Sequence, residues 1–337
     1  MKVLFFTPPA EQRIGGLDAA ITGLRGALER RGIEVGEEVP AHGEGCVAHF
    51  HGLWQMCHAR LAHACRARGI PCVISPHGML EPWAWRHKRW KKWPYFHLVE
   101  KRHLARAQAV LATAAQEAGR LRGFLPGQRI ETLPLGLTGG AKPDYHNARG
   151  QLGWAEDERV LLFLSRIHVK KGLDLLLRAL ATMEHPAPAR LVIVGEGEPA
   201  YVAELQRFAQ KHAGTLPRLA WVGPLWGEAR WKYFQGADLF CLPTHSANFG
   251  LAVLEACQVG TPVLTTVETP WAEELAGGRG YICAPRVDDV RRELARFFAS
   301  ARPTQDARTA LAEWAWGRYH WDTLAGRYVD FYRTLMP

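Results

Sequence analysis

The chain has 337 residues, of which 47% are hydrophobic and 22% are charged, and its formal net charge is +9. This length is too great for one core of ordinary size and fits two domains, and no run approaches the roughly 20 apolar residues that span a bilayer, so membrane contact would be peripheral. Residues 1–150 contain 21 Lys and Arg against 12 Asp and Glu, whereas residues 151–337 contain 21 of each class. The first half is therefore expected to meet an acidic partner.

Seven cysteines are dispersed along the chain without a Cys-x-x-Cys pair. Such an odd, scattered set indicates reduced thiols in a cytoplasm. The apolar run at the N-terminus is too short for a signal peptide and ends at Pro8 and Pro9, so we interpret it as a first strand. A cytoplasmic location, peripheral at most on the inner face of the cell membrane, is therefore expected.

Strand-like and helix-like patterns alternate through the first half, which is typical of a parallel sheet with crossover helices. In chain order they are strand Val3–Phe6, helix Leu17–Arg31, strand Val47–Phe50, helix His58–Arg68, strand Cys72–Ser75, a helical stretch Arg86–Arg106 and strand Ala109–Ala112. Residues 136–147 are rich in Gly and Pro and predict a linker. A domain boundary is expected there.

The alternation begins again after this boundary. The predicted elements are strand Val160–Leu164, helix Gly172–Ala181, strand Leu191–Val194, helix Tyr201–His212, strands Leu219–Val222 and Leu239–Leu242, helix Gly250–Gln258, strand Pro262–Thr265, and helices Val287–Phe298, Thr309–Trp316 and Asp322–Leu335. The fold class is therefore α/β, with two Rossmann-like, doubly wound domains facing each other across a cleft.

Two cations follow the first strand of the second half. Arg166 and Lys171 lie five residues apart in the segment Ser165–Gly172, where a helix is predicted to begin. Positive side chains beside the backbone amides of a helix start suit the phosphates of a diphosphate leaving group. A solvated basic loop is the alternative for such a motif in isolation.

The segment Pro243–Ala256 predicts a buried strand, a polar loop and then a helix. Its loop would bring backbone amides close to a diphosphate or sugar, and Glu255 in the helix can bind two neighbouring ribose hydroxyls. The donor-binding positions expected here are Asn248, Phe249, Gly250, Leu251 and Glu255. A simple strand-to-helix turn is the alternative.

Three further positions follow strands. The pair Gly15 and Gly16 comes after the first strand, and Gly195 opens a turn after Leu191–Val194, so the backbone could approach a ligand at both places. His77 lies beyond the strand Cys72–Ser75. A lone His is more often structural, and that interpretation stands for the similarly placed His51.

Residues 85–96 alternate cations with aromatic side chains. Such a segment can seat in the headgroup layer of an anionic membrane or hold a lipid-linked acceptor. Nucleic acid is not expected as a partner, because no nucleic-acid module is recognised, and a solvated helix is the other alternative. The acceptor or membrane residues are predicted to be Arg86, Lys88, Arg89, Lys91 and Lys92.

Together these segments resemble the retaining glycosyltransferases of family 4, and the HGMLEPW segment around His77 resembles that of bacterial transferases of polysaccharide and lipopolysaccharide assembly. The resemblance implies a GT-B fold. Residues 1–145 would form an acceptor-binding domain and residues 146–318 a nucleotide-sugar-binding domain. Residues 319–337 would form a helix that packs back on the first domain.

The resemblance also implies retaining transfer of a hexose-type sugar from a nucleotide diphosphate sugar to a glycan or lipid-linked acceptor. Arg166 and Lys171 would neutralise the departing phosphates, Glu255 would bind the ribose, and His77 would lie near the donor sugar. No cofactor and no metal are expected, and a front-side displacement is the preferred mechanism.

Ala247 departs from this pattern, because the family places a Glu there, and losing its charged hydrogen bond would slow reaction by roughly ten- to a hundred-fold. Ala247 could be an engineered change, a natural variant rescued by another carboxylate such as Glu268, or a sign that catalysis is lost. Retention of the other motif residues favours the first. The rival functions are an inactive nucleotide-sugar or glycan-binding protein and a sugar-nucleotide epimerase.

Overall fold

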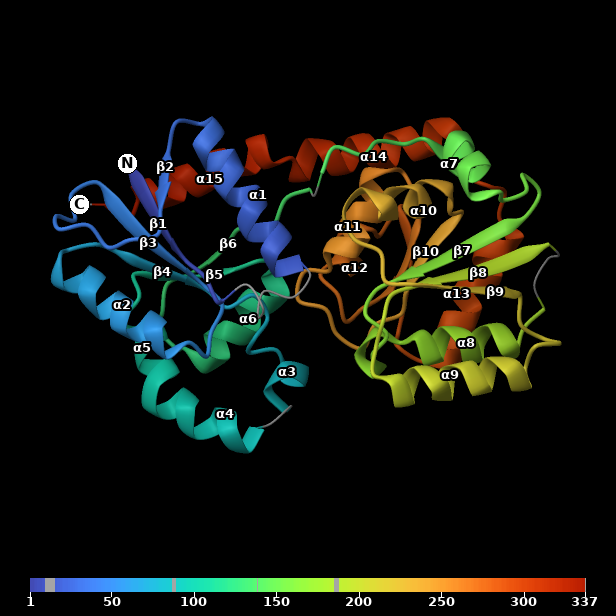
Figure 1. Ribbon diagram of the computed structural model, residues 1–337, viewed down its shortest axis with the longest axis horizontal. Helices are drawn as coiled ribbons and strands as arrows, with labels where there is room; N and C mark the ends of the chain where they lie inside the picture. Colours follow the sequence, from blue (N-terminus) through green and yellow to red (C-terminus); the bar gives the residue numbers. More distant parts are fainter. Residues whose placement is uncertain (10–15, 87–88, 138, 185–187, 337) are drawn as a thin grey trace. The chain divides into compact units, whose positions relative to one another are not determined.

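The computed structural model describes residues 1–336 apart from 10–15, 87–88, 138 and 185–187. The chain divides into two compact units, one made of residues 1–138 and 318–337 and the other of residues 139–317 (Figure 1). Each unit contains a six-stranded sheet, with the order β2-β1-β3-β4-β5-β6 in the first and β12-β11-β10-β7-β8-β9 in the second. All paired strands are parallel, so the predicted α/β architecture of two Rossmann-like units is confirmed.

The first unit contains short strands separated by helices. Its strands are β1 Lys2–Phe6, β2 Glu34–Gly36, β3 Cys46–His51, β4 Cys72–Ser75, β5 Ala109–Ala112 and β6 Ile130–Thr132. Its helices are α1 Gly16–Arg30, α2 Met56–Ala67, α3 Pro82–Arg86, α4 Arg89–Tyr95, α5 Lys101–Ala105, α6 Ala115–Phe124 and α15 Trp321–Arg333, with a π-helical turn, η2 Phe96–Glu100.

The predicted helical stretch from 86 to 106 is confirmed over residues 89–105, where α4, η2 and α5 follow one another without a break, and residues 87–88 lie outside the described residues. Pro94 lies inside α4 and has no backbone N–H to donate to the preceding turn. A π-helical turn begins two residues later, at Phe96.

Both faces of the first sheet are buried, which explains the apolar runs of its strands. Val3 and Phe5 pack in one core with residues of α1 and α15, whereas Leu4 and Phe6 pack in a second core with residues of α2, α5 and α6. Tyr332 of α15 is fully buried in the first of these cores. The prediction that the C-terminal helix returns to the first unit is therefore confirmed.

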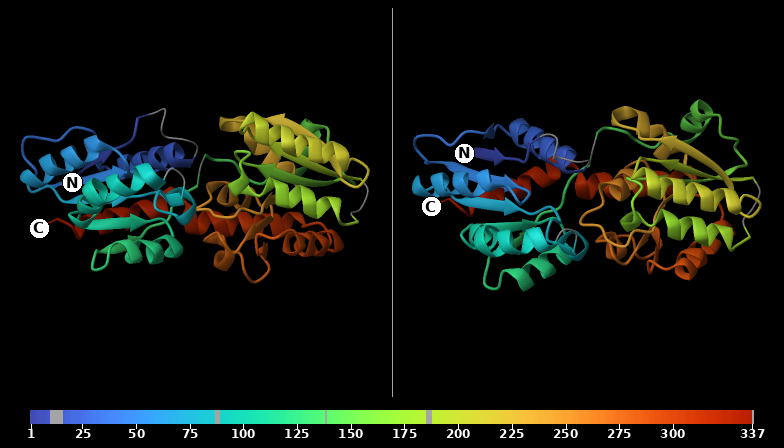
Figure 2. Two further views of the ribbon diagram at one scale, coloured as in Figure 1. Left: turned by 90° about the horizontal axis from the view of Figure 1, so that it is seen from below. Right: turned by 60° about the horizontal axis from the view of Figure 1, so that its bottom comes forward.

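The second unit repeats this design. Its strands are β7 Arg159–Leu164, β8 Ala189–Val194, β9 Arg218–Gly223, β10 Leu239–Leu242, β11 Val263–Thr266 and β12 Gly280–Cys283. Its helices are α7 Tyr145–Leu152, α8 Leu173–Ala181, α9 Pro199–Lys211, α10 Trp231–Gly236, α11 Leu251–Gln258, α12 Trp271–Glu274, α13 Val287–Ala299 and α14 Gln305–Tyr319, with 3-10 turns η3 Val169–Lys171 and η4 Gly227–Arg230. Helices α8 and α9 run side by side (Figures 1 and 2).

The predicted linker is wrong at its C-terminal end, because α7 begins at Tyr145. The Tyr145 hydroxyl donates to Asp238 Oδ1 at 2.7 Å, and Arg149 Nη1 lies 3.3 Å from Asp238 Oδ2 with both side chains fully buried. The amide of Gln258 also donates to the carbonyl of Ala141 at 3.0 Å. These contacts attach the residues from 139 onward to the second unit.

Candidate active site

The candidate site of the second unit lies at the carboxyl ends of its central strands, where loops follow β7, β8, β10 and β11. In an open parallel sheet this edge is the usual place for a ligand. The loops after β7 and β10 are bonded together, because the Lys170 carbonyl accepts from the His245 N–H at 2.8 Å and from Thr244 Oγ1 at 2.7 Å. The structure therefore brings two of the predicted motifs into direct contact.

Two glycines allow this close approach. Gly172 has φ +71°, and a Cβ there would lie 2.0 Å from the carbonyl oxygen of Pro243. Gly195 has φ +143°, and a Cβ there would lie 1.9 Å from the carbonyl oxygen of Ser165. A side chain at either position would push the loops apart, so these glycines maintain the packing of the site.

The cations predicted to bind phosphate lie in the loop after β7. Arg166 is exposed and Lys171 is half-buried, and within the described residues neither side chain pairs with a carboxylate. Burial, with the nearby charges of Lys170 and Arg166, lowers the pKa of Lys171 to about 8. A bound anion would restore the preference of Lys171 for its charged form.

The loop after β10 ends in a left-handed residue, Gly250, with φ +80°, and α11 begins at Leu251. The indole Nε1 of Trp271 donates to the carbonyl of Phe249, and the two rings lie 5.1 Å apart. Phe249 is buried, so its side chain supports the loop, while Asn248 is half-buried. Trp271, the first residue of α12, thus holds this loop in place.

Glu255 is buried in α11 and forms an ion pair with Arg230 Nη2 at 2.9 Å. The Arg230 guanidinium also lies 4.7 Å from the ring centroid of Trp231. The sequence analysis missed Arg230, which lies on η4, and no local pattern would have marked it. The carboxylate predicted to bind ribose is therefore already oriented by a cation.

Ala247 is buried, and its backbone N–H donates to the carbonyl of Glu268 at 3.1 Å. The neighbouring Ser246 hydroxyl is also buried and makes no hydrogen bond within the described residues. The position at which a Glu was expected thus lies directly against the loop that follows β11.

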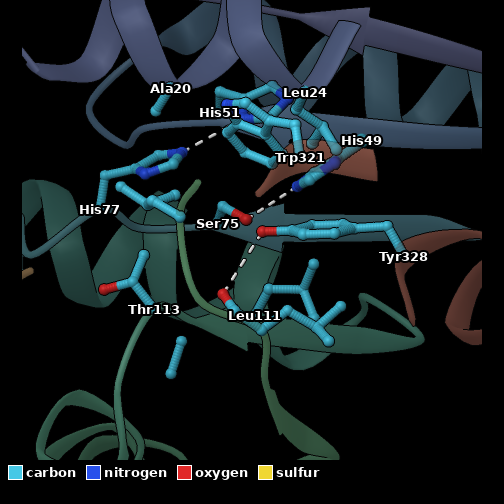
Figure 3. Close-up of a pocket in the computed structure, with 13 residues that line it drawn as sticks. Ala20, Leu24, His49, His51, Ser75, His77, Leu111, Thr113, Trp321 and Tyr328 are labelled. Carbon is cyan, nitrogen blue, oxygen red and sulfur yellow. Dashed lines mark hydrogen bonds between the residues drawn. The ribbon is translucent and has the colours of Figure 1, made fainter. Parts of the chain in front are cut away.

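In the first unit, His77 belongs to a buried polar cluster around a cavity of about 10 Å³ (Figure 3). His77 Nε2 lies 3.1 Å from His51 Nδ1, and the other histidine, His49, lies 2.7 Å from Ser75 Oγ and 2.8 Å from the Tyr332 hydroxyl. His49 and Tyr332 were missed, although the alternation His49-Phe50-His51 could have indicated two histidines on one face of β3.

These histidines are neutral at pH 7. Burial lowers the pKa of His49 to about 3 and that of His77 to about 4, and it lowers the pKa of His51 well below its ordinary value. His77 also has φ +50°, which is unusual for a residue with a Cβ. The cluster can exchange hydrogen bonds but carries no charge. A role for His77 near the donor sugar stays a prediction.

The remaining predicted positions lie in the first unit. Gly16 is the first residue of α1, and Gly15 and Lys88 lie outside the described residues. The backbone places Arg86 in α3 and Arg89 and Lys91 in α4, and the ammonium of Lys92 lies 5.5 Å from the Trp54 ring centroid.

Trp54 was missed by the sequence analysis. Its φ is +70°, and its backbone N–H donates to Glu100 Oε1 at 2.9 Å. Burial raises the pKa of Glu100 to about 7, and this carboxyl group lies in the π-helical turn η2. Neither the strained backbone nor the π turn has a signature in the sequence.

Within the described residues, no helix has both the length and the apolar character needed to cross a membrane. The described His, Cys, Asp and Glu side chains also form no cluster of three or more that could hold a metal ion.

Two family models match the chain. Residues 144–313 match the family described as glycosyl transferases group 1, and residues 46–138 match glycosyltransferase family 4. A D-inositol 3-phosphate glycosyltransferase from Segniliparus rotundus is 28% identical over 243 residues, which cover 69% of this chain and 54% of the relative. The chain spans about half the length of the curated relatives it matches.

Solved structures share the fold. A sucrose-phosphate synthase from Thermosynechococcus elongatus superposes with a TM-score of 0.80 at 19% identity, covering 99% of this chain and 98% of the other. The Anabaena protein HepE in complex with UDP-glucose superposes with a TM-score of 0.72 at 18% identity, covering 99% and 100%. At such identities the likeness concerns the fold, and the predicted GT-B architecture is confirmed.

Proposed function

The chain belongs to the group 1 glycosyl transferases, and on that premise we propose that it moves a hexose-type sugar from a nucleotide diphosphate sugar to a glycan or lipid-linked acceptor, with retention at the anomeric carbon. The proposed process is the assembly of cell-surface polysaccharide, which uses acceptors of this kind. The UDP-glucose named with HepE supports a nucleotide sugar as the donor class.

The observation that carries this proposal is the pair of cations Arg166 and Lys171, which have no carboxylate partner in the described part of the chain. During transfer, the bond from the anomeric carbon to the diphosphate breaks and a bond to the acceptor oxygen forms, while the acceptor proton passes to the leaving phosphate. Negative charge grows on the diphosphate, and preorganised cations stabilise it. In this mechanism the two side chains supply the neutralisation, so no metal cofactor is required.

Glu255 is proposed to bind the ribose of the donor. Its pairing with Arg230 fixes the orientation of the carboxylate, which suits bidentate acceptance from two neighbouring hydroxyl groups. The backbone at Gly195 and Gly250, with Asn248 beside it, is proposed to approach the diphosphate or sugar.

The direct test is a transfer assay that uses a panel of radiolabelled nucleotide sugars. Acceptors include D-inositol 3-phosphate, which the name of the Segniliparus relative suggests, and a lipid-linked oligosaccharide. We expect transfer from one donor, with the product's anomeric configuration retained by NMR. Failure to bind or consume any nucleotide sugar would contradict the proposal, and a new sugar nucleotide formed without acceptor would indicate an epimerase.

The segment from α4 to α5 is proposed to contact an anionic membrane that carries the acceptor. Trp90, Trp93 and Leu98 are 74%, 52% and 66% exposed, and the exposed cations Lys101 and Arg102 follow them. Exposed aromatic rings beside cations suit the interfacial layer of a membrane.

Sedimentation with phosphatidylglycerol vesicles tests this contact. The double variant W90S/W93S should lose several-fold in vesicle binding, because both rings leave the interface. The matched control is W226S in the second unit, where Trp226 is 65% exposed. Equal loss in the control, or equal binding to neutral vesicles, would contradict a specific role for this segment.

A second candidate function is a nucleotide-sugar-binding protein without catalysis, and Ala247 is the observation that favours it. Under this alternative the chain binds a nucleotide sugar without turnover, and the A247E variant also shows no turnover. Turnover by the native chain would exclude it.

A further inference from the structure

Glu268 lies in the loop after β11, beside the position where the sequence analysis expected a carboxylate. Its carbonyl accepts from the Ala247 N–H at 3.1 Å, and its own N–H donates to Thr266 Oγ1 at 3.3 Å. The residue is half-buried, whereas Ala247 is 5% exposed. The backbone of Glu268 is therefore placed against Ala247 by a direct hydrogen bond.

The two loops are joined at more than this point. Thr266 Oγ1 donates to the carbonyl of Thr244 at 2.6 Å, and Trp271 Nε1 donates to the carbonyl of Phe249. Thr244 Oγ1 in turn donates to the carbonyl of Lys170, the residue before Lys171. Glu268 thus belongs to one hydrogen-bonded framework with both loops of the candidate site.

The carboxylate of Glu268 makes no hydrogen bond or ion pair with any residue that the structure describes. Glu255, in contrast, is held by Arg230. A half-buried carboxylate loses part of its hydration, so a ligand with hydroxyl donors would improve its environment. Of these two carboxylates, Glu268 is therefore the one whose oxygens are available to accept hydrogen bonds from a ligand.

We propose that Glu268 supplies the donor-sugar carboxylate that Ala247 does not, accepting hydrogen bonds from sugar hydroxyls and stabilising positive charge that develops at the anomeric carbon. The inference rests on the proposed function and favours the second of the three explanations for Ala247, a natural variant with a relocated carboxylate.

The test compares the native chain with E268Q and with the swap A247E/E268Q, using UDP and UDP-glucose as first probes and the other nucleotides of the panel if those do not bind. E273Q, an exposed carboxylate on α12, is the matched control. Thermal unfolding confirms that each variant folds. Affinity for the nucleoside diphosphate and turnover of the nucleotide sugar are both measured.

We expect E268Q to bind the nucleoside diphosphate as the native chain does but to turn over the sugar nucleotide about ten- to a hundred-fold more slowly. The swap should recover at least ten-fold of that loss, because it returns a carboxylate to the same site, and E273Q should match the native chain.

Native turnover by E268Q would overturn the inference while leaving the proposed function intact. A slow E268Q with no recovery in a folded swap would also overturn it, because Glu268 would then act elsewhere than at the position of Ala247. If E268Q loses affinity for the nucleoside diphosphate itself, Glu268 contacts the nucleotide and the assignment to the sugar is wrong. If the native chain binds no nucleotide sugar at all, the proposed function fails and the inference fails with it.

Discussion

The two units differ in charge at the same edge of the same kind of sheet. In the first unit, His51 at the end of β3 and His77 beyond β4 are neutral and bonded to each other. In the second, Arg166 and Lys171 follow β7 and have no carboxylate partner among the described residues. A common architecture thus holds an uncharged hydrogen-bonding cluster in one unit and fixed positive charge in the other.

The difference follows from burial. Burial favours the neutral form of an imidazole over the charged form, and His49, His51 and His77 line one small cavity. Lys171 is half-buried, and its pKa is lowered to about 8. Because this value lies above 7, the side chain is still mostly protonated at pH 7. Titratable residues therefore make one edge sensitive to acid and the other receptive to phosphate.

The largest expected effect is acid destabilisation of the first unit. A His has an ordinary pKa near 6.5, whereas His49 and His77 keep pKa values of about 3 and about 4 in the folded chain. The unfolded chain therefore binds more protons below pH 6.5, and stability falls as the pH drops from 6.5 toward 4. Between pH 6.5 and 5 these two groups together should lower the free energy of unfolding by about 3 kcal/mol.

Hydrogen exchange checks this prediction by comparing amides of β3 with amides of β10 at pH 6.5 and pH 5, after correction for intrinsic exchange rates. Protection should fall mainly in β3, and H49Q should weaken the pH dependence by deleting one of the titrating histidines. An equal loss of amide protection in β3 and β10 would contradict the prediction that acid destabilises mainly the first unit.

A smaller effect is expected for K171M, which removes one cation from the phosphate-binding pair. Loss of a charge-assisted contact should lower kcat/KM for the nucleotide sugar by about a hundred-fold, with little change in the unfolding midpoint. K211M on α9 is the control, because Lys211 is exposed and lies outside the predicted motifs. Unchanged turnover in K171M would show that Lys171 does not bind the phosphates of the donor.

The smallest effect is expected for E255Q, which keeps the size of the side chain and removes its charge. The weakened ribose contact and the lost pairing with Arg230 should raise the KM for the nucleotide sugar about ten-fold while kcat changes less. The matched control is E228Q, because Glu228 is an exposed carboxylate on η4. A loss confined to kcat would indicate that Glu255 acts on the reacting sugar instead of on the ribose.

Much of the fold could be predicted from local pattern. Strands β4, β5 and β10 have the predicted bounds, because short apolar runs between turn residues are typical of buried parallel strands. The short edge strands β2 and β6 were not predicted, since their residues are only partly buried and carry no apolar run. The helical stretch after Arg86 was predicted, but the π-helical turn within it was not, because such a turn leaves no periodic signal.

The sequence by itself determined which residues stand in each motif, since Arg166 and Lys171, and likewise Gly250 and Glu255, are close neighbours in the chain. Only the tertiary structure decided their partners. Arg230 reaches Glu255, Tyr332 reaches His49, and the Glu268 backbone meets Ala247 across separations that no local pattern spans. Hydrogen bonds and desolvation depend on distance in space, and the packing of loops at a sheet edge sets that distance.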